Sequence, residues 1–236
     1  MSRSDWRILQ YSARCSRIRF IGILPRARIP FDSPIFDMKT FKKTAVIGAG
    51  AWGTALSIIL SKNFGEVSVW AREGEIVDSV AASRENSVFL PGVKIPENVE
   101  FSGDARRVLQ GAQMVVWVVP IKYLSSAAGA FAPHVEEGAI MVNAGKGIEV
   151  GTWRRPSEIL EAAVKQASSV GSIMGPNIAY EVAQDRYAED IVALTSHSDS
   201  VLAARAFSTP SFISAYAALP TKLSPAMPSP FSFMAS

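Results

Sequence analysis

The 236-residue sequence has one cysteine, two histidines and no run of roughly 18 uncharged apolar residues. One cysteine excludes a disulfide scaffold and a cysteine-built zinc site. The two histidines lie far apart in the chain, so we expect no metal site. Without a long apolar run we expect no membrane span. The 48% hydrophobic and 19% charged residues that are present are typical of a globular protein.

The net charge of +3 comes from one end of the chain. Residues 1–43 contain ten Lys or Arg against three Asp or Glu, whereas residues 44–236 contain fourteen against eighteen. The basic balance therefore belongs to the N-terminal segment, and we expect no nucleic-acid partner for the folded part. Residues 1–37 hold seven Arg and no Lys. Three interpretations of this leader stay open: translation starting at Met38, an organelle-targeting peptide, or an arm that binds RNA or lipid.

The middle of the sequence alternates short apolar runs with helical patterns. Strands are predicted at 44–47, 67–70, 114–119, 139–143, 172–174 and, as the last one, 190–194. Helices are predicted at 54–62, 73–83, 104–110, 123–132 and 156–168, and residues 202–207 resemble a final helix. This alternation predicts an α/β domain over 38–206, with a doubly wound, Rossmann-type parallel sheet.

The composition changes again after residue 206. Residues 207–236 contain five Pro and seven Ser, and the single charged residue there is Lys222. Four of the prolines lie between 220 and 230, where they would interrupt a helix or strand. We therefore assign 207–236 to a Ser/Pro/Ala-rich tail outside the domain.

A glycine pattern, G-x-G-x-x-G, follows the first predicted strand and opens the first predicted helix. Gly48 allows the tight turn, Gly50 lets a pyrophosphate approach the backbone, and Gly53 lets the helix pack closely on the strand. The helix N-terminus then offers N–H groups and a partial positive charge to the phosphates. The pattern in this context predicts a dinucleotide site.

The end of the second predicted strand bears on which dinucleotide binds. An acidic residue there would bind the ribose 2′-hydroxyl of NAD, but this chain has Trp70-Ala71-Arg72, followed by Glu73. Arg72 can pair with a 2′-phosphate through two parallel hydrogen bonds. We therefore predict that NADP(H) is preferred and that NAD(H) is the alternative.

Several sequence blocks together resemble the bacterial-type NAD(P)-dependent glycerol-3-phosphate dehydrogenases. The resemblance covers about residues 41–206, and Lys-Gly-Ile-Glu and Gly-Pro-Asn-x-Ala are its most specific blocks. The matching blocks are 46–56, 69–72, 86–92 with 95–98, 118–120, 146–149 with 157–158, and 175–183.

The resemblance implies a reaction and a set of contacts. The reaction is hydride exchange between nicotinamide and C2 of dihydroxyacetone phosphate or sn-glycerol 3-phosphate. The implied cofactor contacts are Ala51, Trp52, Arg72, Pro120, Lys146 and Ala179. The implied substrate contacts are Lys146, Gly175 and Asn177.

The residue chemistry agrees with the role of Lys146. It follows the predicted strand 139–143, so it should lie at the carboxyl edge of the sheet, where doubly wound folds bind ligands. An ammonium group there can hold a substrate oxygen and stabilise the charge that develops as a carbonyl is reduced. Lys146 is therefore the predicted catalytic residue.

The resemblance breaks at the C-terminus. The family has a second, helical domain that carries the main proton-transfer lysine and the groups that hold the substrate phosphate, and nothing in 207–236 matches it. A frame shift or gene truncation would explain the break, and a natural divergent tail is the alternative. The polypeptide as written is then expected to have little or no dehydrogenase activity.

Three functions stay open on the sequence alone. The first is the dehydrogenase of the family, truncated. The second is an inactive NADP-binding fragment. The third is another two-domain dehydrogenase of the hydroxyacid type. In each case the partner is a small molecule, a homodimer stays open, and the expected compartment is the cytoplasm unless residues 1–37 direct the chain to an organelle.

Overall fold

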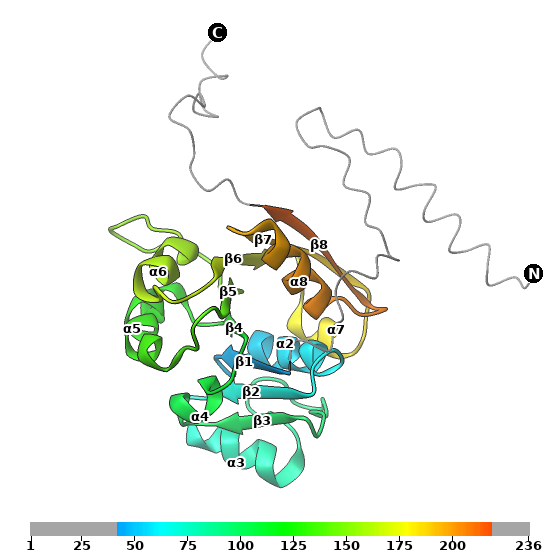
Figure 1. Ribbon diagram of the computed structural model, residues 1–236. Coiled ribbons are helices and arrows are strands. Elements are labelled where there is room, and N and C mark those ends of the chain that lie inside the picture. The colour runs from blue at the N-terminus through cyan, green and yellow to red at the C-terminus, as the bar shows by residue number, and fades with distance from the viewer. Residues whose placement is uncertain (1–41, 219–236) are drawn as a thin grey trace, which may run out of the picture. The chain divides into compact units, whose positions relative to one another are not determined.

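The computed structural model describes residues 42–218, which form an open sheet with helices on both sides (Figure 1). The predicted leader, 1–37, and the tail beyond residue 218 lie outside the described residues. The eight strands run in the order β3-β2-β1-β4-β5-β6-β7-β8. Their bounds are β1 Lys43–Ile47, β2 Glu66–Trp70, β3 Val99–Ser102, β4 Met114–Trp117, β5 Ile140–Asn143, β6 Ser169–Met174, β7 Ala188–Leu194 and β8 Phe212–Ala218.

The predicted fold class is confirmed, since β1 to β6 pair in parallel and the order of the first strands reverses at β1, as in a doubly wound sheet. The helices are α2 Ala51–Ser61, α3 Gly74–Ser83, α4 Ala105–Leu109, α5 Ile121–Phe131, α6 Pro156–Ala163, α7 Ala179–Ala183 and α8 His197–Phe207, with a short 3₁₀ helix, η2, at Ala132–His134. Each crossover between parallel strands passes through a helix or a loop on one face of the sheet.

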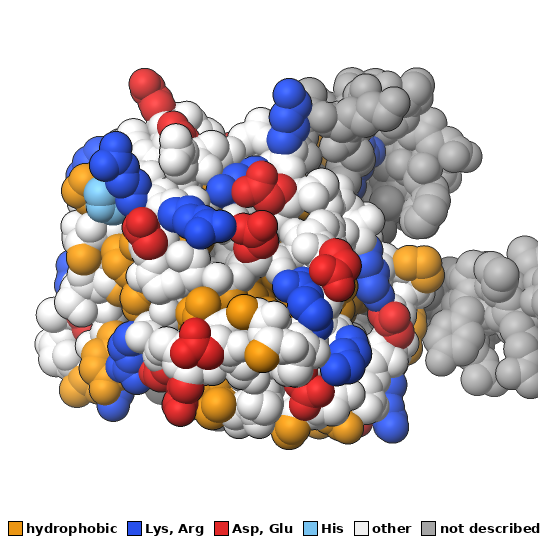
Figure 2. Space-filling model, turned by 90° about the horizontal axis from the view of Figure 1, so that it is seen from below, with side chains coloured by type: hydrophobic (Ala, Val, Ile, Leu, Met, Phe, Trp, Pro, Cys, Tyr) orange, Lys and Arg blue, Asp and Glu red, His pale blue; other side chains and the backbone are white. Residues whose placement is uncertain are grey.

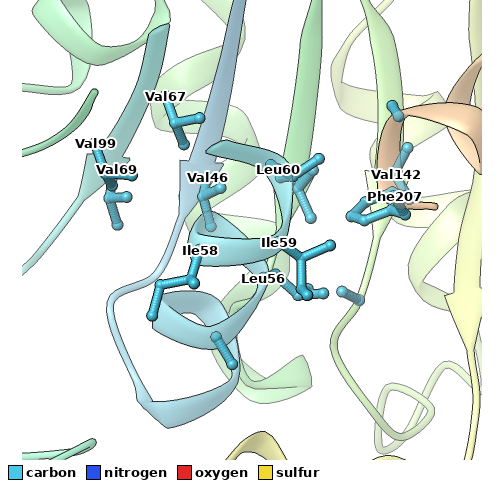
Figure 3. Close-up of a cluster of buried hydrophobic side chains, with 14 of the residues drawn as sticks. Val46, Leu56, Ile58, Ile59, Leu60, Val67, Val69, Val99, Val142 and Phe207 are labelled. Atoms are coloured by element: carbon cyan, nitrogen blue, oxygen red, sulfur yellow. The ribbon is translucent and has the colours of Figure 1, made fainter. Parts of the chain in front are cut away.

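The two faces of the sheet have separate hydrophobic cores. One core joins side chains of α2, α3, α7 and α8 to the sheet, and the other joins those of α4, α5 and α6. Figure 3 shows the first core, where Leu56 and Ile59 of α2 lie beside Val46 of β1. All three are at most 1% exposed, and burying such a side chain contributes roughly 1.5–3 kcal/mol. Trp117 of β4 is fully buried in the second core.

The edge of the sheet formed by β7 and β8 differs from what the sequence predicts. β7 runs antiparallel to β6, so the sheet is mostly and not wholly parallel. No strand is predicted at β3, because apolar and polar residues alternate there over only four positions. The expectation that 190–194 is the last strand is wrong, because β8 pairs with β7 along its whole length. Residues 207–218, assigned to the tail, thus contain the end of α8 and a strand of the sheet.

None of the helices within residues 42–218 is long and apolar enough to cross a membrane. On the face of the molecule in Figure 2, basic and acidic side chains lie interspersed with small apolar patches. This face therefore carries no extended patch of one sign. Several opposite charges of the described residues form ion pairs, for example Arg107 with Glu100 at 3.2 Å and Arg155 with Glu158 at 2.9 Å.

Candidate cofactor and substrate site

The carboxyl ends of the central strands lie side by side at one edge of the sheet. Ile47 at the end of β1 is in register with Trp70 of β2 and Trp117 of β4. Trp117 is in turn in register with Asn143, the last residue of β5. The loops that follow these strands therefore meet at one edge, which is where ligands bind in doubly wound sheets.

The glycine loop connects β1 to α2 with almost no free space between backbones. Gly48 has a φ of +117°, and a Cβ there would lie 2.6 Å from the Val118 carbonyl oxygen. A Cβ on Gly53 would lie 1.9 Å from the Gly48 carbonyl oxygen. The turn and the close helix–strand packing predicted for these two glycines are both present.

Gly50 differs from the other two glycines of the loop. It precedes the first residue of α2, and a Cβ there would meet no protein atom within 4 Å. No side chain caps α2, and its first turn has no acidic residue. The helix begins at Ala51, three residues earlier than predicted, so its N–H groups lie directly at the loop. Open space beside uncapped N–H groups fits the pyrophosphate of a dinucleotide.

A buried asparagine holds the glycine loop in place. Asn86 is fully buried, and its Nδ2 donates to the Ala49 carbonyl at 2.8 Å and to Thr54 Oγ1 at 2.9 Å. Its Oδ1 accepts a hydrogen bond from the Phe89 N–H at 3.1 Å. The sequence placed Asn86 in a matching block but gave no reason for it. The 32-residue separation from Thr54 hides this contact from local patterns.

Two cations act on Tyr123, which lies in the first turn of α5. Arg72 is 69% exposed in its side chain and pairs with Glu73 at 2.5 Å. Lys122 Nζ lies 4.6 Å from the centre of the Tyr123 ring. The hydrogen bond and charge of Lys122 lower the pKa of the exposed Tyr123 hydroxyl, and the charge of Arg72 lowers this pKa further. The charges of Arg72 in the β2 loop and of Lys122 in α5 therefore both act on Tyr123.

The Lys146 loop is shaped by the residues before it. Asn143 is 3% exposed, and its side chain bonds both the N–H and the carbonyl of Gly145, at 3.2 and 2.9 Å. A Cβ on Gly145 would lie 2.7 Å from the Val119 carbonyl oxygen, so this position needs glycine. Gly147 has a φ of +102°. This tight turn leaves Lys146 exposed between the β4 and β5 loops.

The far side of the same loop is held by an ion pair. Glu149 accepts hydrogen bonds from Thr152 and from Arg154, whose Nη2 lies 2.7 Å from the carboxylate. The Thr152 hydroxyl and then the Arg154 guanidinium hold the pKa of Glu149 below its usual value. The Glu149 N–H also donates to the Arg154 carbonyl at 3.0 Å. The Glu of the Lys-Gly-Ile-Glu block therefore closes the loop that begins with Lys146.

Two concave regions meet at Lys146. A groove of about 460 Å³ lies along the ends of β1, β4 and β5, and its lining includes Ala51, Trp52, Pro120, Lys146, Asn177 and Ala179. A cavity of about 400 Å³ lies beside the ends of β5 and β6, and its lining includes Trp52, Lys146, Arg155, Gly175, Asn177 and Asp190. Trp52, Ala144, Gly145, Lys146 and Asn177 border both regions. A group bound in the groove and a small molecule in the cavity would therefore meet at these five residues.

The cavity contains a buried acid that sequence reasoning missed. Asp190 of β7 is 5% exposed, and Ser214 of β8 donates to its Oδ1 at 2.5 Å. Burial raises the pKa of Asp190 to about 7, and the Ser214 hydrogen bond opposes this rise only in part. Asp190 follows Glu189 and has no motif around it. The one signal in the sequence is a charged residue at the start of the predicted strand 190–194.

The structure brings most of the predicted site residues together at this edge. The predicted cofactor contacts Ala51, Trp52, Pro120, Lys146 and Ala179 all line the groove. The predicted substrate contacts Lys146, Gly175 and Asn177 all line the cavity. Arg72 lines neither region and lies in the loop after β2, from which its charge acts on Tyr123 of α5. Within residues 42–218, no three His, Cys, Asp or Glu side chains are grouped as a metal site would need.

Proteins of known sequence match this chain over the same region. "Glycerol-3-phosphate dehydrogenase [NAD(P)+] 2" of Mycobacterium bovis is 37% identical over 166 residues, which are 70% of this chain and 50% of the relative. "Glycerol-3-phosphate dehydrogenase [NAD(P)+]" of Streptomyces griseus is 36% identical over 157 residues, 66% of this chain and 47% of the relative. The chain thus spans about half the length of the curated relatives that it matches.

Solved structures agree with the sequence matches. The crystal structure of a glycerol-3-phosphate dehydrogenase from Coxiella burnetii has a TM-score of 0.70 at 25% identity, over 75% of this chain and 54% of that one. A glycerol-3-phosphate dehydrogenase from Plasmodium falciparum gives the same TM-score and identity over 76% and 54%. Residues 43–200 match the family described as NAD-dependent glycerol-3-phosphate dehydrogenase N-terminus. From its strand order, its glycine loop and these matches, the chain belongs to the NAD-dependent glycerol-3-phosphate dehydrogenase family.

Proposed function

We propose that this chain binds NADP(H) across the groove, with the pyrophosphate at the glycine loop. The open space at Gly50 and the uncapped start of α2 support this position. Ala51, Trp52, Pro120 and Ala179 then contact the cofactor as it runs along the groove toward Lys146.

NADP(H) is the proposed preference over NAD(H). The exposed Arg72 guanidinium lies near Tyr123, and Lys122 adds a second positive charge there. In a doubly wound fold the end of β2 approaches the adenosine ribose, so these cations would face a 2′-phosphate. Arg72 would have to exchange its present partner, Glu73, for the phosphate.

For the whole protein we propose hydride exchange between nicotinamide and C2 of dihydroxyacetone phosphate or sn-glycerol 3-phosphate. The nicotinamide, when bound, supplies or accepts the hydride. Lys146 holds the substrate oxygen at C2 and stabilises negative charge on it during reduction. Gly175 leaves the cavity wall without a side chain, and Asn177 offers an amide to the substrate.

The observation that carries this proposal is the position of Lys146 on both the groove and the cavity. Lys146→Ala should weaken binding of dihydroxyacetone phosphate to the NADPH-loaded chain by roughly tenfold, because a charged hydrogen-bond donor is lost. The affinity for NADPH alone should change by less than about threefold, since the remaining groove is intact.

The two affinities can be measured by fluorescence titration of NADPH and then of dihydroxyacetone phosphate. Lys165→Ala, which removes an exposed lysine bonded to the Glu161 carbonyl, serves as the matched control. Equal binding of dihydroxyacetone phosphate by the Lys146→Ala variant and the wild type would refute the role of Lys146. In a full-length relative, the corresponding change should reduce turnover far more than cofactor affinity.

A further inference from the structure

Two buried polar atoms beside the cavity lack a hydrogen-bond partner within the described part of the chain, and they are complementary. Asn177 Nδ2 is a donor, and Asp190 Oδ2 accepts when the carboxyl group is ionised. Leaving either atom buried without a partner costs about 1–3 kcal/mol, so native structures rarely leave such atoms unpaired.

The two side chains are neighbours across Gly175. A Cβ on Gly175 would lie 2.7 Å from Asn177 Nδ2 and 3.0 Å from Asp190 Cβ. The same Cβ would lie 2.5 Å from the Glu189 carbonyl oxygen of β7. Because Gly175 has no side chain, nothing from this position separates the amide from the carboxyl group.

The carboxyl group is held from its other side. Ser214 of β8 donates to Oδ1 at 2.5 Å, which leaves Oδ2 as the free acceptor. β8 keeps Ser214 in place because it is in register with Asp190 along the β7–β8 pairing. Asp190 is therefore fixed, whereas the Asn177 amide follows β6 in a loop and can rotate about its side-chain bonds.

We propose that Asp190 is a positioning residue for Asn177: its Oδ2 accepts a hydrogen bond from Asn177 Nδ2 and turns the amide Oδ1 toward the cavity. The amide oxygen then accepts a hydrogen bond from a hydroxyl group of the bound small molecule. The identity of that molecule, a hydroxyl-bearing triose phosphate, rests on the proposed function. The pairing of Asn177 with Asp190 does not, since it involves only this chain.

The pairing can be tested without a ligand by recording the side-chain amide resonances of Asn177 in the full chain by NMR. Asn177→Gln identifies the resonances. We expect one Nδ2 proton of the wild type to be shifted downfield and to exchange slowly with water. Asp190→Asn keeps an oxygen acceptor and should retain both features. Asp190→Leu has similar size but no acceptor, and should move the resonances to the values of a solvated amide.

The consequence for binding can be tested by titrating glycerol 3-phosphate into the NADP-loaded chain. Asp190→Leu and Asn177→Ala should each weaken binding by roughly tenfold, and the double variant should lose no more than the larger single loss. Asp190→Asn should bind within about threefold of the wild type, and so should Glu189→Gln, a control on the exposed face of β7.

The outcomes separate this inference from the proposed function. Identical Asn177 resonances in the wild type and the Asp190→Leu variant would overturn the pairing, and so would additive losses in the double variant. Failure of the wild type to bind NADPH, with the expected Asn177 shifts still present, would refute the proposed function and leave the pairing supported.

Discussion

At the β1 side of the site, the buried polar side chain Asn86 uses its amide in three hydrogen bonds to the glycine loop and its surroundings. At the β7 side, Asp190 and Asn177 each keep one buried polar atom without a partner within residues 42–218. The buried amide of Asn86 on the glycine-loop side thus has all these partners within the chain. The cavity side contains groups whose hydrogen bonds depend on small rearrangements or on the molecule that the cavity takes.

The central strands of the sheet and its β6–β8 edge differ in the same way, in how far helices cover them. β4 is buried along its whole length by helices on both faces. From the end of β6 onward, by contrast, Met174, Ile191 and Ile213 are 64%, 50% and 42% exposed, and the first two are paired in register. Parallel strands in the middle of a doubly wound sheet are covered on both faces by crossover helices. The crossover between β7 and β8 is α8, which packs with Val192 and Leu194 in the first core, so within residues 42–218 it leaves Ile191 and Ile213 exposed.

The largest loss of stability is expected from a side chain that forces α2 away from the glycine loop. Gly53→Ala places a Cβ 1.9 Å from the Gly48 carbonyl oxygen, so α2 must move away from β1. We expect the free energy of unfolding to fall by more than about 3 kcal/mol, as measured by urea unfolding.

Gly129→Ala is the matched control for this change. A Cβ at Gly129 of α5 meets no atom within 4 Å, so the added methyl group should leave stability unchanged or raise it by about 1 kcal/mol. A Gly53→Ala variant as stable as the wild type would show that the cofactor side is not rigidly packed, and the contrast between the two sides would disappear.

A smaller, pH-dependent effect is expected on the cavity side. Burial raises the pKa of Asp190 from an ordinary value of 3.8 to about 7 in the folded chain, so the folded chain holds this proton more tightly. Its contribution to stability is therefore present at pH 3 to 4 and is lost as the pH rises through 7. Asp190→Asn should raise the free energy of unfolding by roughly 1–4 kcal/mol at pH 8, and by much less at pH 4.

This prediction requires unfolding curves of both proteins at several pH values. The difference between them should grow from pH 4 to pH 8. A difference that is constant with pH would show that Asp190 does not titrate in this range, and that the cavity side holds no buried acid of raised pKa.

The smallest of the three effects concerns cofactor preference. Arg72→Gln removes a charge from an exposed side chain, so the ratio of NADPH to NADH affinity should fall by roughly tenfold while NADH affinity stays the same. Arg106→Gln, on α4, is the control. If the affinity ratio of the Arg72→Gln variant equalled that of the wild type, the 2′-phosphate would be bound elsewhere, with Lys122 as the next candidate.

The sequence predicted the tight turn and the close packing of the glycine loop because their determinants are local. Gly48, Gly50 and Gly53 act within one turn of chain, and Lys146 directly follows a buried strand, so motif and geometry coincide. The cavity side depends on contacts between distant segments. Asp190 becomes a site residue only through its pairing with Ser214, and β8, which carries Ser214, has a composition that resembled an unstructured tail. Antiparallel pairing of β7 and the buried position of Asn86 are likewise set by long-range packing.

The central claim is that the glycine loop binds a dinucleotide, and NADPH titration of a Gly50→Val variant tests it most directly. A Cβ at Gly50 meets no atom of the described residues within 4 Å, and neither does a Cβ at the control position Gly129, so both variants are expected to fold, which urea unfolding of each protein checks. The added side chain would occupy the space of the pyrophosphate. We predict that Gly50→Val loses NADPH binding by at least about 100-fold, whereas Gly129→Val binds normally. Unchanged NADPH affinity in a folded Gly50→Val protein would contradict the account.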